Sequence, residues 1–255
     1  ERMKLFQPDE ILYVVDKRQE LHFIQVFRCA RKTGLVKEDT RLSFLGFGTM
    51  NGKDGKPFKT REGGVMRLEN LIADIDEEMF TKIVENRSVR DKDARDTAKI
   101  VGLAAIKYGD LSNQATKDYI FDVDRFTSFE GNTGPYILYT IVRIKSILNR
   151  YVEAGGNLEA GEILPASNGS EKNLMLQLSG FGSMIESAFE EKAPHKICAY
   201  IYEVSNAFNS FYHETKILSE ENQAQKESYI RLLQLTKRVL ETSIDLLGFE
   251  APDKM

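Results

Sequence analysis

The sequence predicts a mainly α-helical protein that begins with a short α/β segment. Two apolar, β-rich runs, residues 11–15 and 42–47, flank a helical pattern, which is typical of a β-α-β unit. From Pro135 onward, apolar residues recur almost only at helical spacing, so a boundary near Thr133 separates a mixed part from an all-helical part. A chain of 255 residues suits one or two domains, and 42% hydrophobic with 29% charged residues is an ordinary globular composition.

The composition excludes several classes of protein. Apolar runs are shorter than the roughly 18 residues of a membrane-spanning helix, and the charged start has no signal-peptide core. The two cysteines, Cys29 and Cys198, cannot form a disulfide framework, so we expect buried, unreactive thiols in a cytoplasmic protein. Scattered histidines argue against structural zinc. A net charge of −4 excludes a uniformly basic nucleic-acid binder but leaves room for a local basic patch.

The α/β segment is built from two strands and one helix. Residues 11–15 predict a strand covered on both faces, because the run is continuously apolar. A helix is expected over residues 19–32, ended by Gly34, and the second strand at 42–47 follows through a right-handed connection. Two strands make a poor open sheet, and the chain does not begin with Met. We therefore expect a fragment whose other strands lie upstream of Glu1, and an uncovered strand edge that favours association or disorder.

Two polar residues mark the start of the predicted helix. Gln19 and His22 follow the carboxyl end of a parallel strand, which is where ligands bind in open α/β sheets, and their spacing places them on one helix face. The Gln19 amide can donate and accept, and the His22 imidazole can bind a ribose or a phosphate. An ordinary polar first turn remains the alternative.

A glycine-rich basic segment follows the second strand. Residues 46–64 contain six glycines and one proline, which predicts a long mobile loop, and residues 41–67 carry six Lys or Arg against two acids. The cations of the loop itself are Lys53, Lys56, Lys59 and Arg61. Such groups stabilise the charge on a departing phosphate, and closure of the loop would exclude water. The segment is neither a Walker A motif nor a Rossmann fingerprint, and a solvated basic hairpin remains the alternative.

Further helices are predicted along the rest of the chain, with a short extended piece at 119–123 and a surface loop at 154–172. The helices are expected at 68–86, 93–108, 135–151, 172–191, 195–217 and 224–247. The helix at 135–151 contains no acid and carries Tyr136, Tyr139, Arg143 and Arg150 on one face, with isoleucines on the other. Tyrosine rings stack on unpaired bases and arginines bind phosphate, so this face is a candidate RNA contact; a surface stripe that covers a bundle is the alternative.

Four segments in order resemble arginyl-tRNA synthetases, a family of class I aminoacyl-tRNA synthetases. They are YVVDKRQELHF at 13–23, GKDGKPFKTREGG at 52–64, FEGNTGPY at 129–136 and LLGFEAPDKM at 246–255. The first is similar to the family's strand–helix segment and the second to its signature loop. The third is similar to the start of its anticodon-binding bundle, and the last to its C-terminus. The resemblance covers essentially the whole chain, as the C-terminal half of proteins about twice this length.

The resemblance implies an ATP-dependent arginine–tRNA ligase. Its fold would be a partial Rossmann-like catalytic domain at 1–75, a connecting segment at 76–132 that contacts the inside of the tRNA's bend, and an all-helical anticodon-binding domain at 133–255. Arginine would attack the α-phosphate of ATP, supplied with Mg, to give arginyl-adenylate, and the tRNA's terminal ribose would then accept the arginyl group. No tightly bound cofactor and no membrane partner are implied.

The resemblance also assigns roles to residues. Gln19 would contact arginine and His22 would line the adenylate site, while Lys59 and Arg61 would face the ATP phosphates. Residues from Pro135 onward would grip the anticodon arm.

The sequence departs from the family in three places. Phe58-Lys59-Thr60-Arg61 replaces the Lys-Met-Ser-Lys signature, so Lys53 or Lys56 could take the role at the phosphates. Leu138 and Ile141 stand where the family often has Gln and His, so the base contacts of those residues do not carry over. The His-Ile-Gly-His motif is missing from these residues, so we expect the fragment to be inactive alone. Two alternatives stay open, which are a non-catalytic module that binds the anticodon arm and a helical protein-interaction scaffold.

Overall fold

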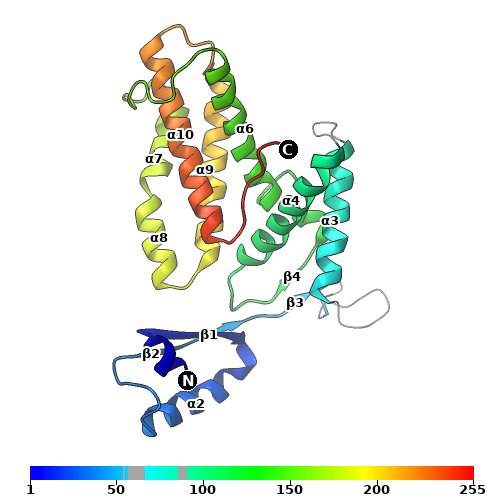
Figure 1. The fold of residues 1–255 in the computed structure, drawn as a ribbon, viewed down its shortest axis with the longest axis vertical. Helices are drawn as coiled ribbons and strands as arrows, with labels where there is room; N and C mark the ends of the chain where they lie inside the picture. Colours follow the sequence, from blue (N-terminus) through cyan, green and yellow to red (C-terminus); the bar gives the residue numbers. More distant parts are fainter. Residues whose placement is uncertain (54, 57–66, 86–90) are drawn as a thin grey trace.

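The computed structural model describes residues 1–53, 55–56, 67–85 and 91–255, and for residues 91 and 92 only the backbone. An N-terminal α/β unit lies at one end of a larger helical body, as Figure 1 shows. The unit contains α1 (Arg2–Phe6), β1 (Glu10–Asp16), the 3₁₀ turn η1 (Lys17–Gln19), α2 (Glu20–Lys32) and β2 (Arg41–Phe47). β1 and β2 pair in parallel, with Ile11 opposite Leu42, so the predicted β-α-β unit is confirmed.

One face of the two-stranded sheet is covered, and the other is open. Tyr13 on β1 packs against Phe23 and Phe27 of α2, with ring centroids 5.1 and 5.3 Å away. Leu12 and Val14 point to the opposite face, because side chains alternate along a strand, and they are 40% and 56% exposed. The prediction that this strand is covered on both faces is therefore wrong within this chain, because α2 packs on one side only.

The helix between the strands ends as its sequence predicts. Gly34 has φ of 68°, the left-handed conformation that glycine tolerates best. The amide of Leu35 donates to the Ala30 carbonyl and the amide of Gly34 to the Arg31 carbonyl, which is the Schellman pattern. Cys29 on this helix is exposed, so the expectation of two buried thiols holds only for Cys198. Among the described residues, no second layer covers the Cys29 face of this helix.

The segment after β2 forms a strand where only a loop was predicted. Met50–Asn51 (β3) pairs in parallel with Tyr119–Ile120 (β4), so the prediction of a loop throughout residues 46–64 is wrong at these two positions. The partner β4 lies within the extended piece predicted at 119–123, but local composition gives no signal that Met50–Asn51 pairs with it. Residues 54 and 57–66 lie outside the described part of the chain, and Lys59 and Arg61 are among them.

The helical body contains long helices that pack on two sides of a shared core. α3 (Leu68–Glu85), α4 (Asp91–Leu111) and the short α5 (Val123–Phe126) form one side. α6 (Gly134–Glu153), α7 (Gly169–Ser179), α8 (Phe181–Glu190), α9 (Pro194–Glu214) and α10 (Gln223–Leu246) form the other (Figure 1). The single helix predicted at 172–191 is thus two helices, which meet at Gly180.

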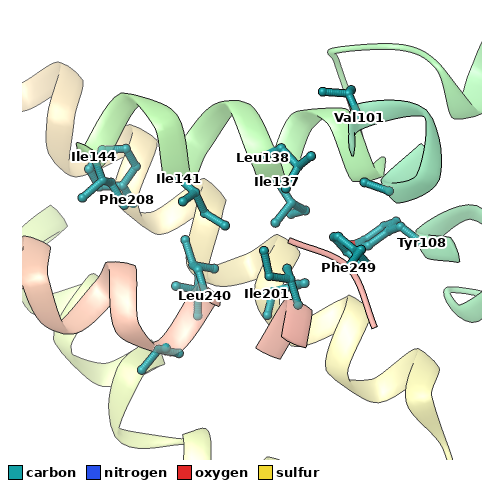
Figure 2. Close-up of a cluster of buried hydrophobic side chains, with 14 of the residues drawn as sticks. Val101, Tyr108, Ile137, Leu138, Ile141, Ile144, Ile201, Phe208, Leu240 and Phe249 are labelled. Carbon is teal, nitrogen blue, oxygen red and sulfur yellow. The ribbon is translucent and has the colours of Figure 1, made fainter. Parts of the chain in front are cut away.

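The core is made from the apolar stripes that the sequence predicts. Figure 2 shows Ile137, Ile141 and Ile144 of α6 facing Ile201 and Phe208 of α9, and all five are fully buried. The segment after α10 returns between α10, α6 and α4, where Phe249 is buried. Side chains of α4 and α6 hold this tail, because Lys107 donates to the Gly248 carbonyl and Lys145 to the carbonyls of Ala251 (3.3 Å) and Pro252 (3.2 Å).

Tyr108 ties the two sides of the helical body together. Its ring is fully buried on α4, and its hydroxyl donates to the Cys198 carbonyl of α9 at 2.8 Å. The same oxygen lies 2.5 Å from the Asn132 side-chain oxygen, in the turn before α6. Burial raises the pKa of the Tyr108 hydroxyl far above its usual value, so the group stays a neutral donor.

Candidate functional site: the strand end, the loop stem and the bundle face

Gln19 and His22 lie where the sequence predicts, beyond the carboxyl end of β1. Asp16 ends the strand and caps η1, because its carboxylate accepts from the Arg18 amide at 2.8 Å and from the Arg18 guanidinium at 2.6 Å. These contacts with Arg18 lower the pKa of Asp16 to about 2. Gln19 ends this turn and His22 lies in the first turn of α2, with both side chains exposed. The turn therefore presents a polar pair to solvent at the strand end.

The first part of the glycine-rich loop, residues 48–51, is called the stem here. It is fixed by hydrogen bonds to residues 115–121, which precede α5. The Gly48 amide donates to the Ala115 carbonyl at 2.8 Å, and the Tyr119 amide donates to the Thr49 carbonyl at 3.1 Å. A Cβ on Gly48 would lie 2.2 Å from the Lys117 carbonyl oxygen, so only glycine allows the two backbones to approach this closely. The loop that was predicted to be mobile therefore begins from a fixed point.

Lys53 pairs with two carboxylates at the start of α5, those of Asp122 immediately before the helix and Asp124 in its first turn. Its ammonium lies 2.7 Å from Asp124 Oδ2 and 3.0 Å from Asp122 Oδ1. The hydrogen bond to Asp124, followed by that to Asp122, raises the pKa of Lys53 above its usual value. In the described part of the chain, Lys53 thus contacts acids rather than Gln19 or His22. Lys56 lies further along the loop, where its carbonyl accepts from the Gly52 amide at 2.8 Å.

The tyrosine and arginine residues of α6 form a connected network with α9. Arg143 donates to Asn209 Oδ1 at 2.7 Å, Asn209 donates to the Tyr136 hydroxyl at 2.8 Å, and that hydroxyl donates to Asn206 Oδ1 at 2.8 Å. Tyr136 is half-buried, and burial is the main cause that raises its hydroxyl pKa. Its ring and hydroxyl are therefore engaged inside the protein.

Next to this network, the half-buried Arg143 guanidinium lies between two rings. The Arg143 guanidinium carbon lies 4.7 Å from the centroid of Tyr139 and 5.3 Å from that of Tyr212 on α9. Tyr139 is 42% exposed and Tyr212 is 37% exposed, so both ring surfaces are partly accessible. Arg150 lies further along α6, in its last turn, and is exposed. We call Tyr139, Arg143, Tyr212 and Arg150 the bundle face.

The sequence analysis does not identify the residues of α9 that contact Arg143 and Tyr136, or the residues of segment 115–124 that contact Lys17 and Lys53. Asn206, Asn209 and Tyr212 recur at a spacing of three residues, so one helix face carries all of them. This spacing indicates a polar helix face, but the apolar stripe of the same helix is the more prominent pattern. Asp118 and Lys17 gave no signal, because their pairing joins residues 101 positions apart.

In the described part of the chain, no group of three or more His, Cys, Asp or Glu could hold a metal ion. None of the helices described is both long and apolar enough to cross a membrane.

Comparison with known families assigns the two parts of the chain to one class of protein. Residues 1–123 match the model of the class I tRNA synthetase (R) catalytic domain, and residues 137–255 match that of the DALR anticodon binding domain. Together they define a class I aminoacyl-tRNA synthetase. The fold is mostly helical, with a class I catalytic part followed by a helical anticodon-binding part, as the sequence predicts.

Relatives and solved structures identify the particular family. The chain is 66% identical to the arginine–tRNA ligase of Agathobacter rectalis and 58% identical to that of Alkaliphilus oremlandii, in both cases over 100% of its length. The arginyl-tRNA synthetase of Thermus thermophilus superposes with a TM-score of 0.84 at 25% identity, over 97% of this chain and 41% of that one. The chain belongs to the arginyl-tRNA synthetase family, and it spans 44% and 43% of the two ligases.

Replacing Gly48 by Ala tests the fixed stem. The new methyl group collides with the Lys117 backbone, so we expect the opening free energy of the β3–β4 pair to fall by about 1–3 kcal/mol. Hydrogen exchange of the Phe121 amide, which donates to the Asn51 carbonyl, measures this opening. Gly169→Ala is the control, because nothing lies within 4 Å of a Cβ there. Equal exchange in both variants would contradict the close approach.

Proposed function

We propose that the chain is the C-terminal portion of an arginine–tRNA ligase. The observation that supports this most is the order of two matches in one chain, a class I (R) catalytic domain followed by a DALR domain. We assign residues 1–75 to the catalytic domain, 76–132 to a connecting segment against the tRNA stem, and 133–255 to anticodon binding. The substrates are arginine, ATP with Mg and a tRNA for arginine, in the cytoplasm.

The strand end and the loop supply the groups for the first step. The arginine carboxylate attacks the α-phosphate of ATP. The bond between the α-phosphorus and the oxygen that bridges to the β-phosphate breaks, and pyrophosphate leaves with the additional negative charge on that oxygen. Gln19 contacts arginine and His22 lines the adenylate site, in keeping with their exposed position at the strand end. The loop cations Lys59, Arg61 and Lys56 face the phosphates, where positive groups stabilise charge that builds in the transition state. Lys53 is the cation best suited to anchor the loop, since two carboxylates hold it.

The bundle face supplies the grip on the anticodon arm. A guanidinium between two partly exposed rings offers a phosphate contact and stacking surfaces together, which unpaired bases and their backbone need. Asn209 holds Arg143 in place, so little side-chain freedom remains to be lost on binding. Tyr136 supports this network through its hydrogen bonds to Asn206 and Asn209, and its ring does not contact the RNA.

The alternative function is that of a non-catalytic tRNA-binding module. The core of the helical body favours it, because the stripes of α6, α9 and α10 bury one another without help from the sheet. In that case the chain binds the anticodon arm and performs no chemistry.

Catalytic activity separates the two functions. We expect arginine-dependent ATP–pyrophosphate exchange, with tRNA present, from the protein extended upstream of Glu1 to the length of its relatives. The 255-residue chain alone gives no exchange, because the adenylate site needs groups from both halves to converge. Exchange by the chain alone, or its absence from the longer protein, would overturn this assignment.

Alanine substitutions on the bundle face test the RNA contact. Arg143→Ala and Arg150→Ala should each weaken binding of a tRNA for arginine, roughly three- to tenfold, because each removes a phosphate partner. The slope of log affinity against log salt should fall by about 1 for each lost contact. Filter binding at several salt concentrations measures both quantities. Arg28→Ala on α2 is the matched control, and it should change neither.

If Arg143→Ala and Arg150→Ala bind tRNA like the parent chain, with the same salt slope, the bundle face is ordinary protein surface. The RNA assignment of these residues then fails, whatever the outcome of the exchange assay.

A further inference from the structure

A single carboxylate oxygen joins the two sides of the proposed catalytic site. Asp118 Oδ1 accepts from the Lys17 ammonium at 2.8 Å and from the Thr49 backbone amide at 2.7 Å. Lys17 begins η1, the turn that ends at Gln19, and Thr49 lies near the start of the glycine-rich loop, immediately before β3. Asp118 itself immediately precedes β4. It therefore contacts both the turn that carries the polar pair and the stem of the loop.

Neighbouring contacts also join η1, the residues before β4 and the stem of the loop. The Lys17 ammonium also donates to the Thr116 carbonyl at 3.4 Å, and a Cβ on Gly46 at the end of β2 would lie 2.8 Å from the Lys17 Cα. β3 and β4 pair directly beyond Asp118. Lys53 meets Asp122 and Asp124 after the stem. The stem is thus held on both sides of β3, and Asp118 supplies the contact nearest to the strand end.

The side chains of this bridge are too exposed to be an important source of fold stability. Lys17 is 42% exposed and Asp118 is 49% exposed, and pairs of this kind add little to stability because water screens them. The hydrogen bond from Lys17, followed by that from Thr49, lowers the pKa of Asp118, so the carboxylate keeps its charge through the neutral range. The arrangement is better suited to fixing geometry than to holding the chain folded.

We propose that Asp118 is a positioning residue of the catalytic site, which fixes the loop stem relative to the turn that carries Gln19 and His22. This inference rests on the proposed ligase function. Asp118 contacts neither arginine nor ATP, and acts through Lys17 and the Thr49 amide. Misplacement of reacting groups by about 1 Å can cost on the order of a hundredfold in rate, so a small displacement of the stem is enough to slow the chemical step.

The test uses Asp118→Asn, Lys17→Met and the double variant in the protein extended upstream of Glu1. We expect each single variant to lower kcat for arginine-dependent exchange about tenfold, with KM for arginine and tRNA affinity within about twofold of the parent. The double variant should be no slower than either single variant, because both substitutions remove the same Lys17–Asp118 interaction. Tm should stay unchanged. In the 255-residue chain, Asp118→Asn should speed hydrogen exchange at the Thr49 amide.

Lys237→Met is the matched control, since Lys237 lies 2.8 Å from Glu241 in an ion pair of similar exposure on α10. It should leave kcat unchanged. If the parent protein catalyses exchange and Asp118→Asn has the same kcat, the positioning role alone is overturned. The role is also overturned if kcat falls only together with Tm, or if the two single effects multiply in the double variant. A parent protein without any exchange would overturn the proposed function, and the positioning role with it.

Discussion

The parallel pairing of Met50–Asn51 with Tyr119–Ile120 is the constraint on which the arrangement of this molecule depends. The two strands are only two residues long, yet they join the α/β unit to the helical body. Gly48 makes the approach possible, because any larger residue would strike the Lys117 backbone. A second contact supports the joint, where Lys192 between α8 and α9 lies 3.2 Å from Glu10 on β1. Together these contacts hold the proposed catalytic groups in one frame with the bundle.

The two parts differ in how they bury apolar surface. The helical body has a continuous core that includes Tyr108, Phe208 and Phe249, and it closes on itself through the tail after α10. The α/β unit depends on one small aromatic cluster around Tyr13 and leaves Leu12 and Val14 exposed. Since the chain spans 44% of the length of the Agathobacter ligase, further strands of a class I catalytic domain would pair along the outer edges of this two-stranded sheet. Order in the unit therefore depends more on its joint with the helices than on its own core.

Local patterns predicted most of the helices, while contacts between distant residues escaped prediction. The isoleucines of α6 and the stripe of α9 were readable, because a period near 3.6 residues marks a buried helix face. β4 falls within the extended piece predicted at 119–123. β3 was not readable, since a two-residue strand carries no periodicity and its partner lies far along the chain. The same reason hid the Lys17–Asp118 bridge and the contact of Arg143 with Asn209. The position of Gln19 and His22 beyond β1 was predictable because a strand end is a local feature. The break at Gly180 was missed because glycine alone does not show whether a helix stops.

On the proposed function, the bundle face and the connecting segment bind one bent RNA. Hydroxyl-radical footprinting of a tRNA for arginine, bound to the 255-residue chain, measures this contact. We expect protection of the anticodon arm together with the inner side of the tRNA's bend, because the described parts of residues 76–132 and 133–255 are held in one frame. Protection of the anticodon arm alone would contradict that shared frame. Equal protection along any RNA of the same length would contradict the recognition itself.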